Sequence, residues 1–305
     1  MTLEHRAFLY GGIEHFLSVS VPYIAEGVEA DEAVIVVVRE PALGALRDVL
    51  APYGETIEFH DSDAFYQHPV RTLKSYQELL LSKRPRSVRA LAETVWGGWT
   101  PRQTVEWARY ESLINVVFGD ADARALCPYD MDGLPQRIID HARQTHPLLE
   151  DRGRTVRNAD YVEPAVFGGR CDRARAFGRP RGADYYAITS DDLHGLRAFV
   201  GERALRHGLD PQAAQHLVTA ANEVAANALR HGSPPMGAWV WADGPELLCE
   251  VGDNGLWHAG PLVGFVPPDS ALERGFGLWT VRLLVDLMEL RAGWDGTFVR
   301  LHVRR

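Results

Sequence analysis

The chain has 305 residues, which at about 150 residues per domain suggests two domains. With 46% hydrophobic and 24% charged residues it has the composition of a folded protein, which excludes a mainly disordered chain. Its formal net charge of −9 argues against a direct nucleic-acid partner, because binding to phosphates needs local positive charge.

Cysteine usage and the N-terminal residues bear on location. Three cysteines that lie far apart, without a CxxC pair, cannot form a disulfide framework, which favours a reducing, cytoplasmic location. The first residues, MTLEHRAFLYGG, lack the basic and apolar runs of a signal peptide. No stretch approaches the about 18 apolar residues of a membrane helix. We therefore expect no membrane partner.

The first 150 residues alternate short apolar runs with helix-length segments. Uninterrupted apolar strands such as AVIVVV are typical of a parallel sheet that is covered on both faces. The pattern therefore predicts a three-layer α/β domain. The expected strands are 7–10, 33–38, 56–60, 88–95 and 125–127, and the expected helices are 12–27, 41–50, 101–118 and 134–146.

Three kinds of ligand site can be considered in this region. The phosphate-binding loop GxxxxGK[ST] is absent, since neither lysine of the chain, Lys74 or Lys83, follows a glycine. His141 and His146 have no third partner nearby in the sequence, which favours a helix-end histidine over a metal site. In open α/β sheets ligands bind beyond the carboxyl ends of strands, and the residues there suit either a small-molecule pocket or ordinary caps and loops: Gly11, Gly12, Arg39, Glu40, His60, Asp61, Trp96, Tyr129 and Asp130.

Several segments of this region carry a family resemblance. The series HRAFLYGG, VPYIAEGVEADEAVIVVV, WARYESLINVVF, LCPYD and HARQTHPLL resembles the MEDS domain, the methanogen/methylotroph sensory domain, over about residues 5–150. The resemblance implies a RecA-like α/β sensor that lacks the ATPase loop. It also implies a small hydrocarbon derivative as ligand, whose identity the sequence does not give.

The middle of the chain differs in charge from both ends. Residues 1–150 carry a net charge of −8 and residues 191–305 carry −4, whereas residues 151–190 carry +3. This middle segment holds scattered Gly, Pro and Arg without an apolar period, which is typical of a linker or an extended crossover. A switch segment or a clamp across a domain interface is the alternative. We expect a first domain at residues 1–150, a linker at 151–189 and a second domain at 190–305.

The last segment has the order α-α-β-β-α-β-β. Asp-Gly pairs at 243–244 and 295–296 predict two hairpins, and a third helix is expected at about 276–287. The pattern predicts an α+β two-layer sandwich with helices on one face of a mixed sheet. Capping residues bound the first two helices: Thr189, Ser190, Asp191, Asp192, Gly208, Asp210, Pro211 and Gly232.

The chemistry-bearing residues lie at the joints of this pattern. Glu223 and Asn227 are four residues apart on the second helix and share a face. Asn227 can offer a carbonyl oxygen to Mg²⁺, and Glu223 can accept a proton from a hydroxyl that attacks a terminal phosphate. Alone, this spacing is most often an exposed polar face. Three signals follow it: Gly252-Asp253-Asn254-Gly255 after a strand, Gly275-Phe276-Gly277-Leu278 at a helix start, and Thr297.

Together these signals resemble the GHKL superfamily (gyrase, heat-shock chaperone, histidine kinase, mismatch-repair ATPase) over about residues 190–305. The resemblance implies a Bergerat-type ATP-binding fold, with Asn227 as the Mg²⁺ ligand and Glu223 as the catalytic base. It also implies that Asp253 accepts a hydrogen bond from the adenine amino group. The resemblance further implies that Gly255 lies near the adenine base and that Gly275 and Gly277 line the phosphates. It places Thr297 beside Asp253.

Within the superfamily, NEVAANALRHG and a short lid most resemble the anti-sigma-factor serine kinases. Those proteins bind a sigma factor and phosphorylate a serine on an antagonist protein, and they commonly form homodimers. Three features depart from the pattern. Trp257 replaces a glycine, three prolines (261, 267 and 268) restrict the lid, and no lysine follows Lys83. The cations left for the phosphates are therefore Arg230, Arg274 or the metal.

The expected function is that of a cytoplasmic signalling regulator. A small-molecule sensor would control an Mg-ATP-binding protein serine/threonine kinase whose partner is a sigma factor or an anti-sigma antagonist. A sensor histidine kinase is disfavoured, because no helical hairpin with a phosphoacceptor histidine precedes the domain. One alternative is a non-catalytic, nucleotide-dependent partner-binding module, which Trp257 and the lid prolines support. Another is an interaction domain that has lost the nucleotide.

Overall fold

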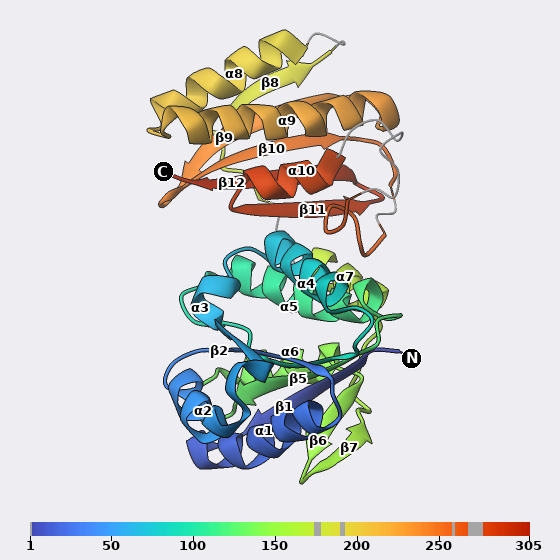
Figure 1. Cartoon of the computed structure of the whole chain (residues 1–305). Helices are drawn as coiled ribbons and strands as arrows, with labels where there is room; N and C mark the ends of the chain where they lie inside the picture. Colours follow the sequence, from blue (N-terminus) through green and yellow to red (C-terminus); the bar gives the residue numbers. More distant parts are fainter. Residues whose placement is uncertain (1, 174–177, 190–192, 258–259, 268–276) are drawn as a thin grey trace. The chain divides into compact units, whose positions relative to one another are not determined.

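The computed structural model divides the chain into two compact units, Met1–Gly168 and Gly169–Arg305, and each is a sheet with packed helices (Figure 1). No described helix is both long and apolar enough to cross a membrane. The residues that the structure describes are 2–173, 178–189, 193–257, 260–267 and 277–305.

The first unit is built on a seven-stranded sheet. Its strands are β1 (Glu4–Tyr10), β2 (Ala33–Val38), β3 (Ile57–Asp61), β4 (Val88–Ala92), β5 (Ala123–Asp130), β6 (Leu148–Asp151) and β7 (Arg154–Arg157). They lie in the order β3-β2-β4-β5-β1-β6-β7, and only β7 pairs antiparallel. Every residue of β2 is buried, as its uninterrupted apolar run predicted.

Helices cover both faces of this sheet (Figure 1). Because side chains alternate along a strand, Phe8 and Leu126 face α1 and α2, whereas His5 and Cys127 face α4 and α5. The predicted three-layer α/β domain is confirmed. Its helices are α1 (Gly12–Glu29), α2 (Ala42–Leu50), the 3₁₀ turn η1 (Ala51–Thr56), α3 (Ser62–Phe65), α4 (Pro69–Lys83), α5 (Pro101–Val117) and α6 (Gln136–Thr145).

The segment expected to be a linker, residues 151–189, contains regular structure. It holds β7, α7 (Pro164–Arg173) and β8 (Asp184–Ile188). Strand β6 pairs with β1 in parallel, and the side-chain amide of Asn158 donates to the carbonyl oxygen of His146 at 2.6 Å. Part of this segment therefore completes the first sheet, and β8 belongs to the second unit.

The second unit has a five-stranded sheet in the order β11-β12-β10-β9-β8. All described pairings are antiparallel, so the expectation of a mixed sheet was wrong. The reason is that β12 lies between β10 and β11, so β11, which follows the crossover helix α10, does not form a parallel pair with β10. Strand β8, which was expected to be linker, pairs with β9 as an antiparallel edge strand. The further elements are α8 (Leu193–Arg206), α9 (Pro211–His231), β9 (Met236–Asp243), β10 (Glu246–Asp253), α10 (Gly277–Leu284), β11 (Leu287–Gly293) and β12 (Gly296–Arg304).

Local signals set several of these boundaries. The Asp210 carboxylate accepts hydrogen bonds from the backbone N–H groups of Gln212 (2.9 Å) and Ala213 (3.1 Å), so α9 begins where the sequence predicted. Both Asp-Gly hairpins are confirmed. Helix α10 ends at Leu284, earlier than expected, because β11 begins at Leu287. Of the expected first helix start, residues 190–192 lie outside the described residues.

The two faces of the second sheet differ in chemistry. One face packs apolar side chains, among them Cys249 and Leu301, against α8, α9 and α10, which confirms the two-layer α+β sandwich. On the opposite face the buried carboxylate of Glu250 accepts hydrogen bonds from Arg300 (Nε–Oε2 2.9 Å) and from Arg179. The Arg179 guanidinium also stacks 3.6 Å from the centre of the Trp239 ring.

A buried histidine links three strands of this sheet. The His302 ring lies between Glu246 (Nδ1–Oε2 3.1 Å) and Glu289 (Nε2–Oε2 3.0 Å). Burial acts to lower the pKa of His302, but its hydrogen bonds and charge interactions with both carboxylates outweigh burial and raise it. A raised pKa stabilises the folded chain below the unfolded value of about 6.5, and this stabilisation is lost as pH rises through the folded pKa.

We therefore expect His302→Gln to lower the free energy of unfolding more at about pH 6 than at about pH 9. Denaturant unfolding of the full chain at both pH values measures the difference. His216→Gln, at a half-exposed position on α9, is the control and should show no such pH dependence. A loss at His302 that is equal at both pH values would contradict the charged ring.

Candidate functional site

The second unit contains a cavity of about 890 Å³ between the end of α9, the end of β10, the start of β12, residues 255–257, 260–264 and 266–267, and the start of α10. Five predicted site residues line it: Asn227, Asp253, Gly255, Gly277 and Thr297. Glu223 and Arg230 are not among the described lining residues. Gly275, and also Arg274, lie outside the residues that the structure describes.

Asp253, the last residue of β10, is held in a fixed orientation. Its side chain is 5% exposed, and Oδ1 accepts hydrogen bonds from the backbone N–H groups of Gly255 (2.6 Å) and Ser233 (3.2 Å). Within the described part of the chain no group donates to Oδ2. A buried carboxylate oxygen of this kind is a strong acceptor for a ligand that brings an N–H group.

Two glycines allow the backbone to close around this carboxylate. A Cβ at Gly232 would lie 2.5 Å from the Asp253 carboxyl carbon, and one at Gly255 would lie 2.6 Å from Oδ1. The hydroxyl of Thr297 donates to the carbonyl oxygen of Gly255 at 3.1 Å, which fixes the chain after β10. The wall beside Asp253 is therefore bare backbone, which a flat ring can approach closely.

The end of α9 presents a second oxygen to the cavity. Oδ1 of Asn227 accepts a hydrogen bond from Nη2 of Arg230 at 3.1 Å, and Nε of Arg230 donates to the carbonyl oxygen of Ala226 at 3.1 Å. The Asn227 oxygen thus already faces a cation. A neutral oxygen in this position fits Mg²⁺, which takes few protein ligands and fills its other positions with water and phosphate oxygens. Half-buried Glu223 lies one turn earlier on the same helix.

The described part of the predicted lid is packed against α10. Residues 260–265 form hydrogen-bonded turns (Val263 N to Gly260 O, 3.2 Å; Phe265 N to Leu262 O, 2.9 Å). The Phe265 ring is buried, and the Arg282 guanidinium lies 4.0 Å from its centre. Trp257, which stands where the GHKL resemblance implies a glycine, lines the cavity. An indole therefore occupies part of the cavity wall.

The cavity combines three features that suit a nucleotide. A buried carboxylate can accept from an amino group on a ring, bare backbone leaves room for the ring, and α10 begins at Gly277 on the cavity wall. The first N–H groups of a helix have no partner within the helix and favour anions such as phosphate.

In the first unit the structure brings together only part of the predicted strand-end set. The rings of Trp96 and Tyr129 lie 6.1 Å apart. The backbone N–H of Arg39 donates to Glu93 Oε2 at 3.0 Å, and its guanidinium lies 3.7 Å from Asp63. Burial, with the nearby charge of Asp130 as a smaller cause, raises the pKa of Glu93 despite its contacts with Arg39.

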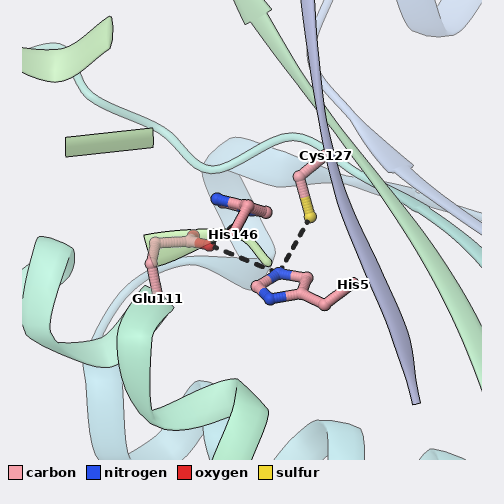
Figure 2. A group of neighbouring side chains, drawn as sticks. All are labelled: His5, Glu111, Cys127 and His146. Atoms are coloured by element: carbon pink, nitrogen blue, oxygen red, sulfur yellow. Dashed lines mark hydrogen bonds and ion pairs between the residues drawn. The ribbon is translucent and has the colours of Figure 1, made fainter. Parts of the chain in front are cut away.

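Sequence reasoning missed a second cluster, formed by His5, Glu111, Cys127 and His146 (Figure 2). His146 does end α6, as expected of a helix-end histidine, but its ring is fully buried 4.0 Å from the His5 ring. Burial lowers the pKa of His5 to about 4 and raises that of Glu111 to about 7. The available signal was a histidine and a cysteine on the same face of two apolar strands.

Comparison with known proteins follows the division into two units. Residues 4–147 match the family model described as "MEDS: MEthanogen/methylotroph, DcmR Sensory domain", and residues 187–303 match that of the histidine kinase-like ATPase domain. No curated protein matches.

Two solved structures are similar to part of this chain. The RsbU and RsbW domains of Rv1364c from Mycobacterium tuberculosis are 20% identical over 41% of this chain and 32% of that one, with a TM-score of 0.31. The Acinetobacter baumannii histidine kinase AdeS is 11% identical over 40% of this chain and 67% of that one, with a TM-score of 0.25. The chain therefore carries a region that matches the MEDS sensory domain, followed by a region that matches the histidine kinase-like ATPase domain, which is of the GHKL type.

Proposed function

We propose that the chain is a signalling regulator in which the MEDS domain controls an Mg-ATP-dependent protein serine/threonine kinase of the anti-sigma-factor type. The observation that carries this proposal is the buried Asp253 carboxylate, whose Oδ2 has no donor among the described residues, in one cavity with Asn227 and the start of α10. Its partners would be a sigma factor or an anti-sigma antagonist protein, and the kinase would work as a homodimer.

In the proposed complex the adenine amino group donates to Oδ2 of Asp253, and the ring lies against the backbone at Gly255. The phosphates lie at the start of α10 near Gly277. Mg²⁺, when bound through the amide oxygen of Asn227, would neutralise phosphate charge that this acidic chain does not compensate with lysine. Arg230 would release that oxygen and turn to the phosphates.

The proposed transfer uses Glu223 as the base. The hydroxyl oxygen of an acceptor serine or threonine forms a bond to the γ-phosphorus, the bond to the bridging oxygen breaks, and ADP leaves. Glu223 takes the hydroxyl proton. Because this carboxylate is half-buried and outside the described lining of the cavity, the acceptor hydroxyl must come from a protein that docks over α9.

A second candidate is a nucleotide-dependent binding module without transfer. It is favoured by the Arg230–Asn227 hydrogen bond, which occupies the proposed metal ligand, and by Trp257 in the cavity wall. It shares nucleotide binding with the kinase and differs only in phosphoryl transfer.

We expect Asp253→Asn to weaken Mg-ATP binding roughly tenfold to a hundredfold, because an amide N–H₂ would replace the oxygen that accepts from adenine. Titration calorimetry of the full chain with Mg-ATP measures the change. The exposed hairpin variant Asp295→Asn is the matched control and should bind as the parent does. Absence of saturable Mg-ATP binding by the parent chain would refute both candidate functions.

Transfer is tested with Mg-ATPγS, the full chain and fractionated cell protein. We expect thiophosphate on serine or threonine, identified by mass spectrometry, and a loss of about a hundredfold or more with Glu223→Ala. The matched control is Glu202→Ala at an exposed position on α8, which should leave labelling unchanged. Saturable binding without any labelling would favour the binding module, and labelling that persists in Glu223→Ala would exclude Glu223 as the base.

A further inference from the structure

Four buried side chains from different elements of the first unit point toward one another (Figure 2). His5 comes from β1, Glu111 from α5, Cys127 from β5 and His146 from the end of α6. Their donor atoms all lie within 4.8 Å of one another. Neither the proposed nucleotide site nor the kinase reaction uses any of them.

Hydrogen bonds fix the tautomer of His5. Its Nδ1 lies 3.0 Å from Oδ1 of Asn115, whose amide nitrogen donates to the carbonyl oxygens of Ser112 (3.1 Å) and Thr145 (2.8 Å). The amide is therefore oriented with its oxygen toward the ring, so Nδ1 of His5 carries the proton. The electron pair of Nε2 is left facing the cluster.

The same argument applies to His146. Its Nδ1 lies 2.9 Å from the carbonyl oxygen of Ala142, which can only accept, so Nδ1 carries the proton. Nε2 of His146 has no hydrogen-bond partner and lies 3.7 Å from Oε2 of Glu111. In protein metal sites, a histidine ligand is oriented in the same way by a hydrogen bond from the ring nitrogen that does not bind the metal.

Three electron-pair atoms consequently converge, Nε2 of His5, Nε2 of His146 and Oε2 of Glu111, and the thiol of Cys127 is the donor beside the first of them. Thr94 donates to Oε1 of Glu111, and the Tyr129 hydroxyl also interacts with this carboxylate. Oε2 has no partner within hydrogen-bond distance and lies 3.9 Å from Nε2 of His5. Sγ of Cys127 lies 3.4 Å from the same nitrogen. Buried acceptors that face one another are costly unless a proton or a cation lies between them.

We propose that His5, Glu111, Cys127 and His146 bind one divalent transition-metal ion of the zinc class. Thiolate and imidazole donors select zinc-like ions over Mg²⁺ or Ca²⁺. At the usual Zn–N and Zn–S lengths, donor atoms of a tetrahedral site lie roughly 3.3–3.6 Å apart. Three of the six donor pairs, at 3.4, 3.7 and 3.9 Å, lie within a few tenths of an ångström of these values, and the other three pairs lie within 4.8 Å.

The surroundings suit a structural ion. Three of the four residues, His5, Glu111 and Cys127, line a cavity of about 50 Å³, which is otherwise lined mainly by apolar side chains such as Phe118. The four donors would complete a closed tetrahedral shell. On binding, the Cys127 thiol proton, together with any proton on Glu111, leaves to solvent and the sulfur binds as thiolate.

The test uses the full chain after chelator treatment and dialysis. We expect the chain to take up about one Zn²⁺, and Co²⁺ in its place to give a thiolate-to-metal charge-transfer band together with the visible bands of tetrahedral Co²⁺. Zn²⁺ should also raise the midpoint of thermal unfolding, since an ion that binds only the folded state stabilises it. A parent chain that binds neither ion would overturn the proposal and leave a proton shared within the cluster.

Cysteine and histidine variants identify the residues that bind the ion. Cys171→Ser with Cys249→Ser leaves Cys127 as the only cysteine and should keep the charge-transfer band. Cys127→Ser and His146→Gln should lose the bound ion, whereas His141→Gln, one turn earlier on α6, should retain it. If the Cys127 and His146 variants do not fold, the double serine variant still decides, because loss of its band would place the metal on another cysteine.

Discussion

The alternation of side chains along buried strands is the constraint on which both units depend. On β1 and β5 it sends Phe8 and Leu126 toward α1 and α2, and it sends His5 and Cys127 toward α5. On β10 it sends Cys249 toward the helices and Glu250 to the opposite face. A shift of one residue in the strand pairing of either sheet would exchange its two faces. The polar side chains named here would then no longer meet their partners.

Elements with strong local signals could be predicted from the sequence. The apolar run of β2, the Asp210 cap and both Asp-Gly hairpins are encoded within a few residues, and the structure confirms them. Strand β8 was missed, because its residues DYYAI are half exposed and follow an arginine-rich stretch. Helix α4 was missed as well. Edge strands obtain their stability from a neighbour that local patterning does not reveal.

The two sites differ in how far the sequence could reveal them. The residues around Asp253 belong to a spaced motif, and the structure places most of that motif around one cavity. The hydrogen bond from Arg230 to Asn227 was not foreseeable, because a long side chain has many rotamers. The histidine cluster depends on the pairing of β1 with β5, strands that more than a hundred residues separate in the sequence.

Arg179 connects the basic middle segment to the interior of the ATPase domain. Its guanidinium stacks on Trp239 and shares the Glu250 carboxylate with Arg300, and Glu250 is fully buried. Without Arg179, the buried Glu250 carboxylate would keep only one of its two arginine partners, Arg300, in a low-dielectric environment. Tension on the segment that precedes β8 would therefore reach β10, the strand that ends in Asp253, as an electrostatic penalty without any movement of the apolar core.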